Sequence, residues 1–524
     1  MTENIVIVGA GPVGMLLACE LLERGTPVRI VDDVRLHTAH SRATVIWPRL
    51  LELMHHTGIT ERLVEAGHRA DGVSFYSRRR RLGTAWVNRL PDLPYPFAVT
   101  IAQSETERII EARLTELGGK VERGARLTGI RNPGGERVGL TLESHDGTRE
   151  EVETSWLVGA DGAHSTVRKL LGASFDGMQF DVSFAVTDAV LEGDAPANVL
   201  SYCYAPEGSL ALVPMAGQVS RIAISIPHAP EGTEPPREFY QRVIDERAPG
   251  RNVVGDMRFS AVFRVHARAT TRFRYGRCLL IGDAAHIMSP ASAQGMNTGM
   301  QDAAALGWRL HAITAGWLPE SALTDYDLDR RPAAEAVVRA TTIQTKLGIA
   351  STRSAILVRD NVIRAADRTG LFQRAIAPML AQTNVRYPTA DSRGGSAARE
   401  ARHGRRIPAL PAGPAARITE HPSVTVDGTT WPALATDRPT VLLWPGRRPP
   451  LGWDRVCTQV RTLVGDRAAV ITAPTTRGPL SAALGRSSTI ALIRPDGHLF
   501  TRIAPEDAVR IADALDDFTL RTGR

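Results

Sequence analysis

The stretch IVIVGAGPVGMLLACELLERG, residues 5–25, decides the fold of this chain. It predicts a short apolar strand, then a turn containing Gly9, Gly11 and Gly14, and a helix that begins at Pro12. This order of strand, turn and helix is the context that a dinucleotide-binding fingerprint requires. The first glycine allows a tight turn, the second lets the backbone approach a pyrophosphate, and the third lets the helix pack closely on the strand.

A second strand is expected over residues 27–31, and it ends at Asp32. A carboxylate at this distance from the glycines accepts hydrogen bonds from ribose hydroxyls. Glycine triplets also occur in turns that bind no ligand, so a further segment is needed to decide between the two interpretations.

That segment is LLIGDAAHIMSPASAQGMNTGMQDA, residues 279–303. A buried strand closes at Gly282, and Asp283 is placed to hold a polyol hydroxyl, such as one on a ribityl chain. After Pro290 a helix is expected, whose free amides and positive end would stabilise an anionic reduced flavin. The residues at its start are Gly295, Met296 and Asn297. Together the two segments predict the two ends of one FAD site.

Composition limits the class of protein. With 524 residues, of which 43% are hydrophobic, the chain is long enough for two or three domains. It has no apolar run of 18 residues, no basic region before its first apolar stretch and no cleavage-like site after it, so we expect neither a membrane span nor a signal peptide. Four cysteines without paired spacing favour a reducing cytoplasm and argue against a bound metal.

The formal net charge of +7 is small for this length, and dispersed arginines carry most of it. The one dense run, residues 78–81, lies between two strand-like stretches, so it is either a solvated hairpin turn or a patch for the phosphate of a nicotinamide cofactor. With 5% aromatic residues there are few stacking platforms, and we expect no nucleic-acid partner.

The chain is expected to form an α/β fold in which a Rossmann-like domain carries an insertion. Residues 1–174 form the first part of the FAD-binding domain, with a short strand-rich excursion at 72–100. Residues 175–270 predict an inserted substrate domain made only of strands, because alternating apolar stretches such as VLSYCYA are separated by Gly/Pro turns. Residues 271–390 return to the FAD-binding domain and continue as helices.

A polar, proline-bearing linker is expected over residues 391–417. Strands and helices alternate again over 418–524, which predicts a small α/β domain. No CxxC occurs there, so its role is expected to be structural or oligomeric rather than redox.

These motifs, in this order, resemble those of the class A FAD-dependent aromatic monooxygenases, the family with the para-hydroxybenzoate hydroxylase fold. The chain is most similar to polyketide-tailoring and rifampicin-monooxygenase-like members, in which the C-terminal domain is thioredoxin-like. The resemblance implies that Asp161 and Gly162 of VGADGAHSTVR serve both FAD and a transient NADPH or NADH. It also implies flavin contacts by Arg42 and Gln103.

Two departures from the family pattern concern the flavin site. Ser292 and Ala293 stand where members have two glycines, which leaves open how the flavin docks or moves. Asp33 replaces the usual basic residue after the strand-two acid, with Arg35 two positions later, so the adenine contact is uncertain.

The resemblance implies that NADPH or NADH reduces FAD and that O2 then forms a flavin C4a-hydroperoxide, which oxygenates a phenol. The substrate is expected to be a small polycyclic aromatic of the polyketide type, as in antibiotic biosynthesis. Tyr202 is a weak candidate for catalysis, and Tyr202, Tyr204 and Arg221 are candidates for substrate binding. The residues themselves also allow plain packing on a sheet face.

Three alternatives stay open from the sequence. Baeyer-Villiger insertion and oxidative ring cleavage or rearrangement use the same scaffold, and a FAD-binding partner protein would catalyse no oxygenation at all. We expect a monomer or a homodimer.

Overall fold

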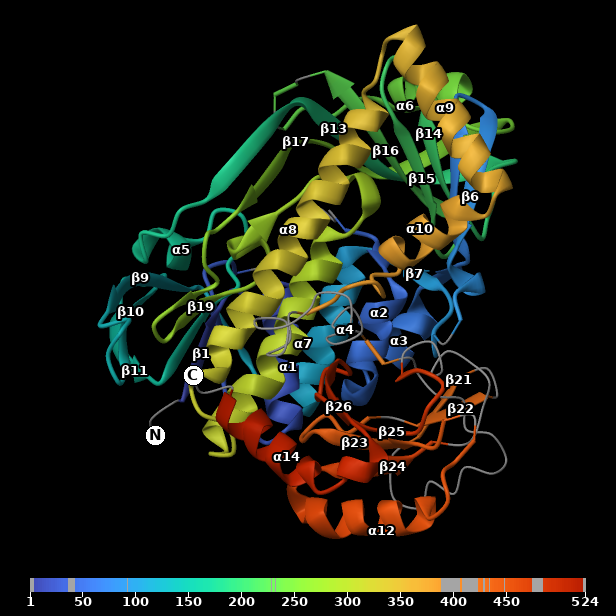
Figure 1. Ribbon diagram of the computed structural model, residues 1–524. Coiled ribbons are helices and arrows are strands. Elements are labelled where there is room, and N and C mark those ends of the chain that lie inside the picture. The colour runs from blue at the N-terminus through green and yellow to red at the C-terminus, as the bar shows by residue number, and fades with distance from the viewer. Residues whose placement is uncertain are drawn as a thin grey trace.

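The computed structural model of the protein describes residues 4–35, 43–91, 93–227, 229–230, 232–387, 406–407, 423–426, 429–432, 434–446, 448–473 and 484–521. Its main parts are a central α/β body, a large mixed sheet at one end and a smaller α/β domain at the opposite end (Figure 1). The predicted linker over 391–417 lies outside the described residues, except for Arg406 and Ile407.

The central body is built on a six-stranded sheet in the order β18-β19-β12-β1-β2-β8. All its strand pairs are parallel except that of β18 with β19. Parallel sheets are buried on both faces, which explains why β1 is four apolar residues in a row. The strands are β1 (Ile5–Val8), β2 (Arg29–Asp32), β8 (Val121–Arg123), β12 (Trp156–Gly159), β18 (Arg274–Tyr275) and β19 (Cys278–Leu280).

Helices and two small sheets complete this body. Helix α1 packs against both α4 and α7, and α7 packs in turn against α8 (Figure 1). The helices are α1 (Pro12–Glu23), α2 (Pro48–Met54), α3 (Ile59–Ala66), α4 (Gln103–Glu116), α5 (Thr166–Leu170), α7 (Gly295–Thr314) and α8 (Ala322–Gly348). The small sheets run β3-β7-β4 and β11-β10-β9, with β3 (Val45–Ile46), β4 (His68–Ala70), β7 (Ala98–Thr100), β9 (Ala125–Arg131), β10 (Val138–Ser144) and β11 (Arg149–Thr154).

The large sheet has eight strands in the order β20-β17-β13-β16-β15-β14-β5-β6. Helices α8, α9 and α10 lie on the side of this sheet that faces the central body (Figure 1). The elements are β5 (Gly72–Ser77), β6 (Arg80–Trp86), β13 (Asp176–Gly193), β14 (Leu200–Tyr204), β15 (Leu210–Pro214), β16 (Val219–Pro227), β17 (Asn252–Ala269), β20 (His286–Ile287), α6 (Arg237–Arg247), α9 (Arg353–Arg368) and α10 (Leu371–Leu380).

Two sequence expectations for this region need correction. The stretch 175–270 is not made only of strands, because α6 interrupts it and buries Tyr240, Val243 and Ile244 on one face. The strand-rich excursion is not a separate feature of the FAD-binding domain, because β5 pairs in parallel with β14 and so completes the large sheet. Such a pairing joins residues more than 120 positions apart and leaves no local signal.

The C-terminal domain contains a four-stranded sheet in the order β24-β23-β25-β26, with helices α12 and α14 packed together on one side. That helical layer shares its core with the end of α7, where Trp308 stacks on Phe518 with ring centroids 6.2 Å apart. The elements are β21 (Ser423–Val426), β22 (Thr429–Pro432), β23 (Thr440–Trp444), β24 (Ala469–Thr472), β25 (Thr489–Ile493), β26 (Leu499–Ile503), α12 (Trp453–Val464) and α14 (Arg510–Arg521).

No helix in the described part of the chain is both long and apolar enough to cross a membrane. Within the same residues no group of three or more His, Cys, Asp or Glu side chains is arranged to hold a metal ion.

Candidate flavin and substrate site

Three turns that lie far apart in the sequence meet at one edge of the six-stranded sheet. Strand pairing places Val8 beside Gly159, and Gly159 beside Leu280, so that the strands β1, β12 and β19 end together. The turns that follow them are residues 9–11, 160–162 and 281–283. In open α/β sheets the carboxyl ends of the strands are where ligands bind.

The first turn has the shape of a phosphate cradle. A Cβ atom on Gly9 would lie 2.4 Å from the carbonyl oxygen of Ala160, and one on Gly14 would lie 2.0 Å from the carbonyl oxygen of Gly9. A Cβ on Gly11, by contrast, would meet nothing within 4 Å. No acidic residue occupies the first turn of α1, and no side chain caps it. Free amides, a positive helix end and open space at Gly11 suit a pyrophosphate.

Asp32 lies at the end of β2, beside this cradle. Its carboxylate accepts hydrogen bonds from the backbone amides of Ala10 at 2.6 Å and Val34 at 2.7 Å. Each carboxylate oxygen has a second lone pair, so Asp32 can still accept a hydrogen bond from a ribose.

Gln103 is the first residue of α4, and its Oε1 accepts a hydrogen bond from the amide of Ala43 at 3.0 Å. This contact places the glutamine next to the segment that carries Arg42. Arg42 itself lies outside the described residues, so its predicted flavin contact stays a prediction.

The third turn and the start of α7 form the other end of the site. Gly282 and Asp283 begin a short 3-10 helix, η3 (Gly282–Ala284), in which Asp283 is exposed. Pro290 begins a second one, η4 (Pro290–Ser292), which leads to the first helical residues Gly295 and Met296. The first turn of α7 has no acidic residue and no side-chain cap. Its amides are therefore oriented to stabilise negative charge.

Asn297 lies in the first turn of α7, but its side chain is bound entirely to protein. Its Oδ1 accepts a hydrogen bond from the amide of Trp47 at 2.8 Å, and its Nδ2 donates to the carbonyl oxygens of Val45 at 2.7 Å and Ala293 at 3.1 Å. Trp47 also donates from its indole nitrogen to Ala293, at 3.2 Å. The Asn297 side chain therefore fixes the loop that precedes α7, and only its backbone amide remains for a ligand.

Asp161 also has a structural part in its turn. Its Oδ2 accepts hydrogen bonds from the amides of Thr166 at 2.6 Å and Val167 at 3.0 Å, and its Oδ1 accepts one from the hydroxyl of Ser165 at 2.5 Å. The carboxylate thus organises the start of α5, while Gly162 turns the backbone with φ +76°. Ligand contacts by these two residues stay a prediction.

A buried aromatic cluster lies on the face of the large sheet that points toward the α7 loop. Tyr202 and Tyr204 share this face because they are two positions apart on β14. Their ring centroids are 5.2 Å apart. The ring centroid of Phe75, on β5, lies 6.1 Å from that of Tyr202 and 6.2 Å from that of Tyr204. Ala293 packs against the same cluster. The predicted substrate tyrosines and Ala293, in the loop that leads into α7, therefore belong to one hydrophobic cluster.

The hydroxyls of the two tyrosines differ. Tyr204 accepts a hydrogen bond from Nε2 of Gln344 on α8, at 3.1 Å. The hydroxyl of Tyr202 is buried near the side chains of Ser209 and Gln344, but no described residue makes a hydrogen bond of good geometry with it. Burial raises the pKa of Tyr202 to about 12, so the phenol is neutral at physiological pH. A buried polar group without a partner calls for a ligand or water.

Arg221 lies on the same sheet face, directly opposite Val213 on β15. Its guanidinium is paired with the carboxylate of Asp188, which is as deeply buried as the arginine. This pairing gives Arg221 a structural part in the sheet, and its contact with substrate stays a prediction.

The comparisons with known proteins identify the family. A model for the FAD binding domain matches residues 2–341. The chain belongs to the FAD-binding flavoprotein monooxygenases. Residues at the sheet edge fit that cofactor, since the glycine cradle at residues 9–14 and the uncapped starts of α1 and α7 match its phosphates and its ring. FAD is therefore the cofactor of this flavoprotein.

Individual relatives support the same assignment. The flavoprotein is 31% identical over 533 residues to a 12-dehydrotetracycline 5-monooxygenase/anhydrotetracycline 6-monooxygenase of Streptomyces rimosus, which covers 100% of this chain and 99% of the relative. It is 34% identical to an uncharacterized aromatic compound monooxygenase, YhjG, of Bacillus subtilis, over 74% of this chain and 77% of that one. The solved structure of OxyS anhydrotetracycline hydroxylase from Streptomyces rimosus superposes with a TM-score of 0.75 at 29% identity, covering 98% of both chains. These matches place the flavoprotein among aromatic monooxygenases rather than among non-oxygenating FAD-binding partners.

Sequence reasoning missed Trp47, Asp302 and Gln344, whose contacts shape the site. Asp302 accepts a hydrogen bond from the amide of Gly282 at 3.1 Å and is paired with His286 at 2.6 Å. Only Asp302 had a sequence signal for a part in the site, since it lies within the segment 279–303, two turns after the start of α7.

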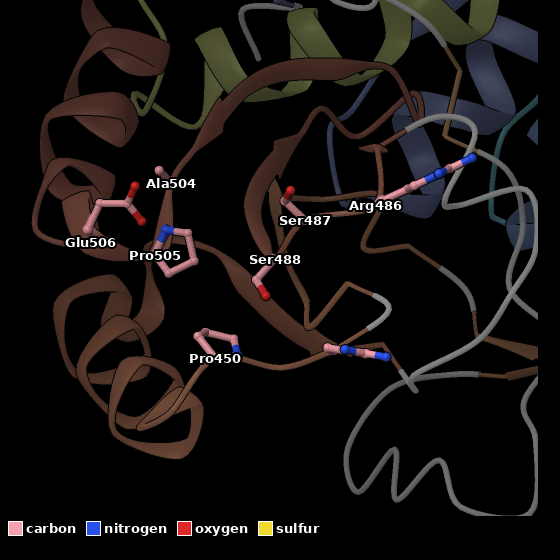
Figure 2. Close-up of a pocket in the computed structure, with 8 residues that line it drawn as sticks. Pro450, Arg486, Ser487, Ser488, Ala504, Pro505 and Glu506 are labelled. Atoms are coloured by element: carbon pink, nitrogen blue, oxygen red, sulfur yellow. The ribbon is translucent and has the colours of Figure 1, made fainter.

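The C-terminal domain has a groove of about 510 Å³ (Figure 2). None of the residues that line it is a cysteine, and the Ser488 hydroxyl donates to the carbonyl oxygen of Pro445 at 2.8 Å. Cys457, on α12, is buried, and burial raises the pKa of its thiol. The groove therefore carries no reactive thiol. Its lining residues are Arg448, Pro450, Arg486, Ser487, Ser488, Ala504, Pro505 and Glu506.

Proposed function

We propose that the protein uses NADPH or NADH, together with O2, to hydroxylate a polycyclic phenolic aromatic of the polyketide type. The observation that carries this proposal is the buried aromatic cluster of Phe75, Tyr202 and Tyr204, in which the Tyr202 hydroxyl makes no hydrogen bond of good geometry with a described residue. Flat aromatic side chains match a flat aromatic ligand, and one polar group fixes its orientation. The likeness over the whole chain to monooxygenases named for tetracycline compounds supports the same substrate class.

When bound, FAD supplies hydride acceptance and oxygen activation. The residues of the chain then have three tasks. The amides at the start of α7 stabilise negative charge on the flavin ring. Tyr202 donates a hydrogen bond to the phenolic oxygen of the substrate, because its own pKa keeps it protonated. The apolar side chains around Phe75 and Tyr204 exclude water from the site, which limits side reactions in which activated oxygen is lost before it reaches the substrate.

We extend the proposal to the nicotinamide contacts, the oligomeric state and the cellular compartment. We propose that the contacts to NADPH or NADH are transient and involve the turn at Asp161 and Gly162. The assembly is a monomer or a homodimer, and the C-terminal domain is of the thioredoxin-like type. The four cysteines are buried and unpaired, which supports a reducing compartment such as the cytoplasm.

Anaerobic stopped-flow reduction tests the proposal. The FAD-loaded protein is mixed with NADPH or NADH, with and without a panel of polycyclic phenols. We expect one nicotinamide to reduce the flavin, and at least one phenol to accelerate the reduction. A flavin that neither nicotinamide reduces, with any member of the panel, would contradict it.

Baeyer-Villiger insertion or ring cleavage is the second candidate, because Ala293, at φ +51°, adds a Cβ to the loop beside the proposed flavin position where the family resemblance leads one to expect glycine. The products separate the two reactions, since hydroxylation adds an aryl hydroxyl whereas insertion converts a ketone to an ester or lactone.

A further inference from the structure

A hairpin turn of the C-terminal domain is buried inside the protein. It joins β25 to β26 and is closed by backbone hydrogen bonds from the amide of Arg494 to the carbonyl oxygen of His498 and from the amide of Gly497 to the carbonyl oxygen of Arg494. Arg494, Asp496 and His498 are only 8%, 6% and 3% exposed. Turns of this kind usually lie on the surface, where water satisfies their polar groups. A buried, charged turn therefore needs partners elsewhere in the protein.

The partners belong to the FAD-binding part of the chain. Nη1 of Arg494 lies 2.8 Å from Oδ2 of Asp329 on α8, and that oxygen also accepts a hydrogen bond from Arg309 of α7 at 2.6 Å. The backbone oxygen of Asp496 accepts a hydrogen bond from Arg49 of α2 at 2.5 Å. The turn therefore contacts α8 and α2 directly, and Asp329 links it to Arg309 of α7. Figure 1 shows β26 at the side of the C-terminal domain that faces the central body.

Tyr387 connects the turn to a second group of charges. Its ring lies against the ring of His498, with centroids 4.2 Å apart, and 5.0 Å from the guanidinium carbon of Arg494. Its hydroxyl accepts a hydrogen bond from Arg330 at 2.9 Å. One residue thus contacts both the C-terminal turn and the arginine that follows Asp329 on α8.

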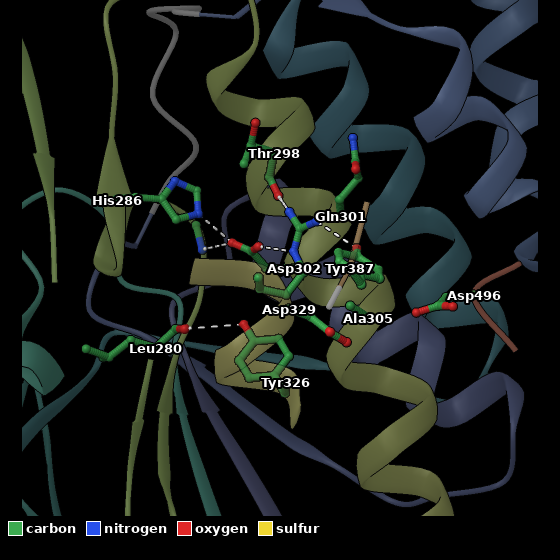
Figure 3. A network of polar contacts seen from close by, with 12 residues as sticks. Leu280, His286, Thr298, Gln301, Asp302, Ala305, Tyr326, Asp329, Tyr387 and Asp496 are labelled. Carbon is green, nitrogen blue, oxygen red and sulfur yellow. Dashed lines mark hydrogen bonds and ion pairs between the residues drawn. The ribbon is translucent and has the colours of Figure 1, made fainter. Parts of the chain in front are cut away.

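Arg330 links Tyr387 to the turn at residues 281–283. Figure 3 labels its partners Thr298, Asp302 and Tyr387. It donates to Oδ1 of Asp302 at 2.7 Å and to the carbonyl oxygen of Thr298 at 3.0 Å. The second oxygen of Asp302 accepts the hydrogen bond from the Gly282 amide. Burial alone would raise the pKa of Asp302, but Arg330 and His286 outweigh burial and lower it, so the carboxylate stays charged.

We propose that the buried turn Arg494–His498 is a positioning element of the flavin site, acting through Asp329 and Tyr387 on Arg330 and through Asp302 on the amide of Gly282. The C-terminal domain then contributes to FAD affinity through this chain of contacts, although the turn itself lies outside the glycine cradle at residues 9–14 and the turn at residues 281–283. This inference depends on FAD binding and not on the oxygenation chemistry, so it can fail or hold independently of the proposed reaction.

The direct test is Arg494→Gln in the full-length protein, which keeps hydrogen-bond donors but removes the charge. FAD is titrated into the apoprotein, and hydrogen exchange is followed by mass spectrometry for a peptide containing Gly282. We expect the dissociation constant for FAD to rise about tenfold. The Gly282 amide should exchange about tenfold faster, while a peptide covering β1 (Ile5–Val8) keeps its rate.

The matched control is Arg467→Gln, which breaks an exposed ion pair with Asp516 within the same domain. It should leave both measurements unchanged, since exposed pairs contribute little. A folded Arg494→Gln protein with wild-type FAD affinity and wild-type exchange at Gly282 would overturn the proposal. Equal acceleration in every peptide would also overturn it, because the effect would then be general destabilisation.

A milder variant covers the case in which Arg494→Gln does not fold. Tyr387→Phe keeps the ring contacts with His498 and removes only the hydrogen bond to Arg330. We expect the FAD dissociation constant to rise about threefold or more, again with faster exchange at Gly282 alone. Unchanged values for this variant would overturn the proposal.

Discussion

At the scale of single residues, Ala293 has a strained backbone conformation in the candidate flavin site. Its φ is +51°, a left-handed conformation that costs a residue with a Cβ about 1 kcal/mol or more. Hydrogen bonds from Trp47 and Asn297 to its carbonyl oxygen hold it there. The strain identifies Ala293 as a site where glycine would fit better.

We therefore expect Ala293→Gly to raise the free energy of unfolding by about 0.5–1 kcal/mol, as measured by urea denaturation of the apoprotein. The neighbouring Ser292→Gly is the matched control. Ser292 ends a short 3-10 helix and is not among the residues with positive φ, so the added chain entropy should leave stability unchanged or lower it. Equal effects of the two glycines would show that strain at Ala293 is not the cause.

In the proposed reaction, Tyr202 orients the substrate. With the best phenol of the panel, Tyr202→Phe should lower kcat/KM by about 10- to 100-fold, because a buried hydrogen bond to the substrate is lost. Tyr204→Phe is the control, and we expect an effect below about threefold, since its hydroxyl is bound to Gln344. FAD affinity should not change in either variant. Wild-type kcat/KM in Tyr202→Phe would remove the residue from the mechanism.

His498 gives the buried turn a pH dependence. Burial lowers its pKa from the ordinary 6.5 to about 4, with Asp496 opposing the shift. Between those values the unfolded chain binds more protons than the folded one, so stability falls as pH drops from about 6.5 to 4. The slope contributed by one group is at most about 1.4 kcal/mol per pH unit. Between about pH 6.5 and pH 4, the free energy of unfolding of His498→Gln should fall less steeply than that of the wild type. Identical slopes would contradict a lowered pKa of His498 in the folded protein.

At the scale of elements, the glycines of the first turn have separable roles. Gly14→Ala places a Cβ against the carbonyl oxygen of Gly9 and should destabilise the apoprotein itself. The Cβ of Gly11→Ala meets no atom of a described residue within 4 Å, so the apoprotein should keep its melting temperature and yet lose FAD binding, because the methyl group occupies the space of the pyrophosphate. Flavin fluorescence and thermal melting measure the two effects. Normal FAD affinity in Gly11→Ala would argue against this site.

The elements that sequence alone could predict are those with local signals. The strand β1, the helix from Pro12 and the acid at Asp32 follow from patterns within 30 residues. Helix α6 was missed within a region dominated by strands, although Pro235 and Pro236 before it and its apolar spacing are helix-start signals. Asn297 was expected at the helix start, where its backbone amide would face the flavin, but the side-chain contacts with Trp47 and Val45 could not be expected, because those residues lie about 250 positions away in sequence.

At the scale of the whole molecule, long-range pairing determines what sequence patterns could not show. The parallel pairing of β5 with β14 completes the sheet that carries Tyr202, and the ion pair of Arg494 with Asp329 ties the C-terminal domain to the flavin helices. Neither has a local signature, because each depends on the folded arrangement of separate segments. The family resemblance predicted the order of the domains along the chain, whereas the contacts between them are seen only in the structure.

We propose that this flavoprotein transfers an oxygen atom from O2 to a polycyclic phenol. Turnover of the FAD-loaded protein with its preferred nicotinamide, a phenol from the panel and ¹⁸O2, followed by mass spectrometry of the product, tests this oxygen transfer. We expect a hydroxylated product that carries ¹⁸O, formed in proportion to the nicotinamide consumed. Nicotinamide oxidation that yields only hydrogen peroxide with every phenol, or a product without ¹⁸O, would contradict it.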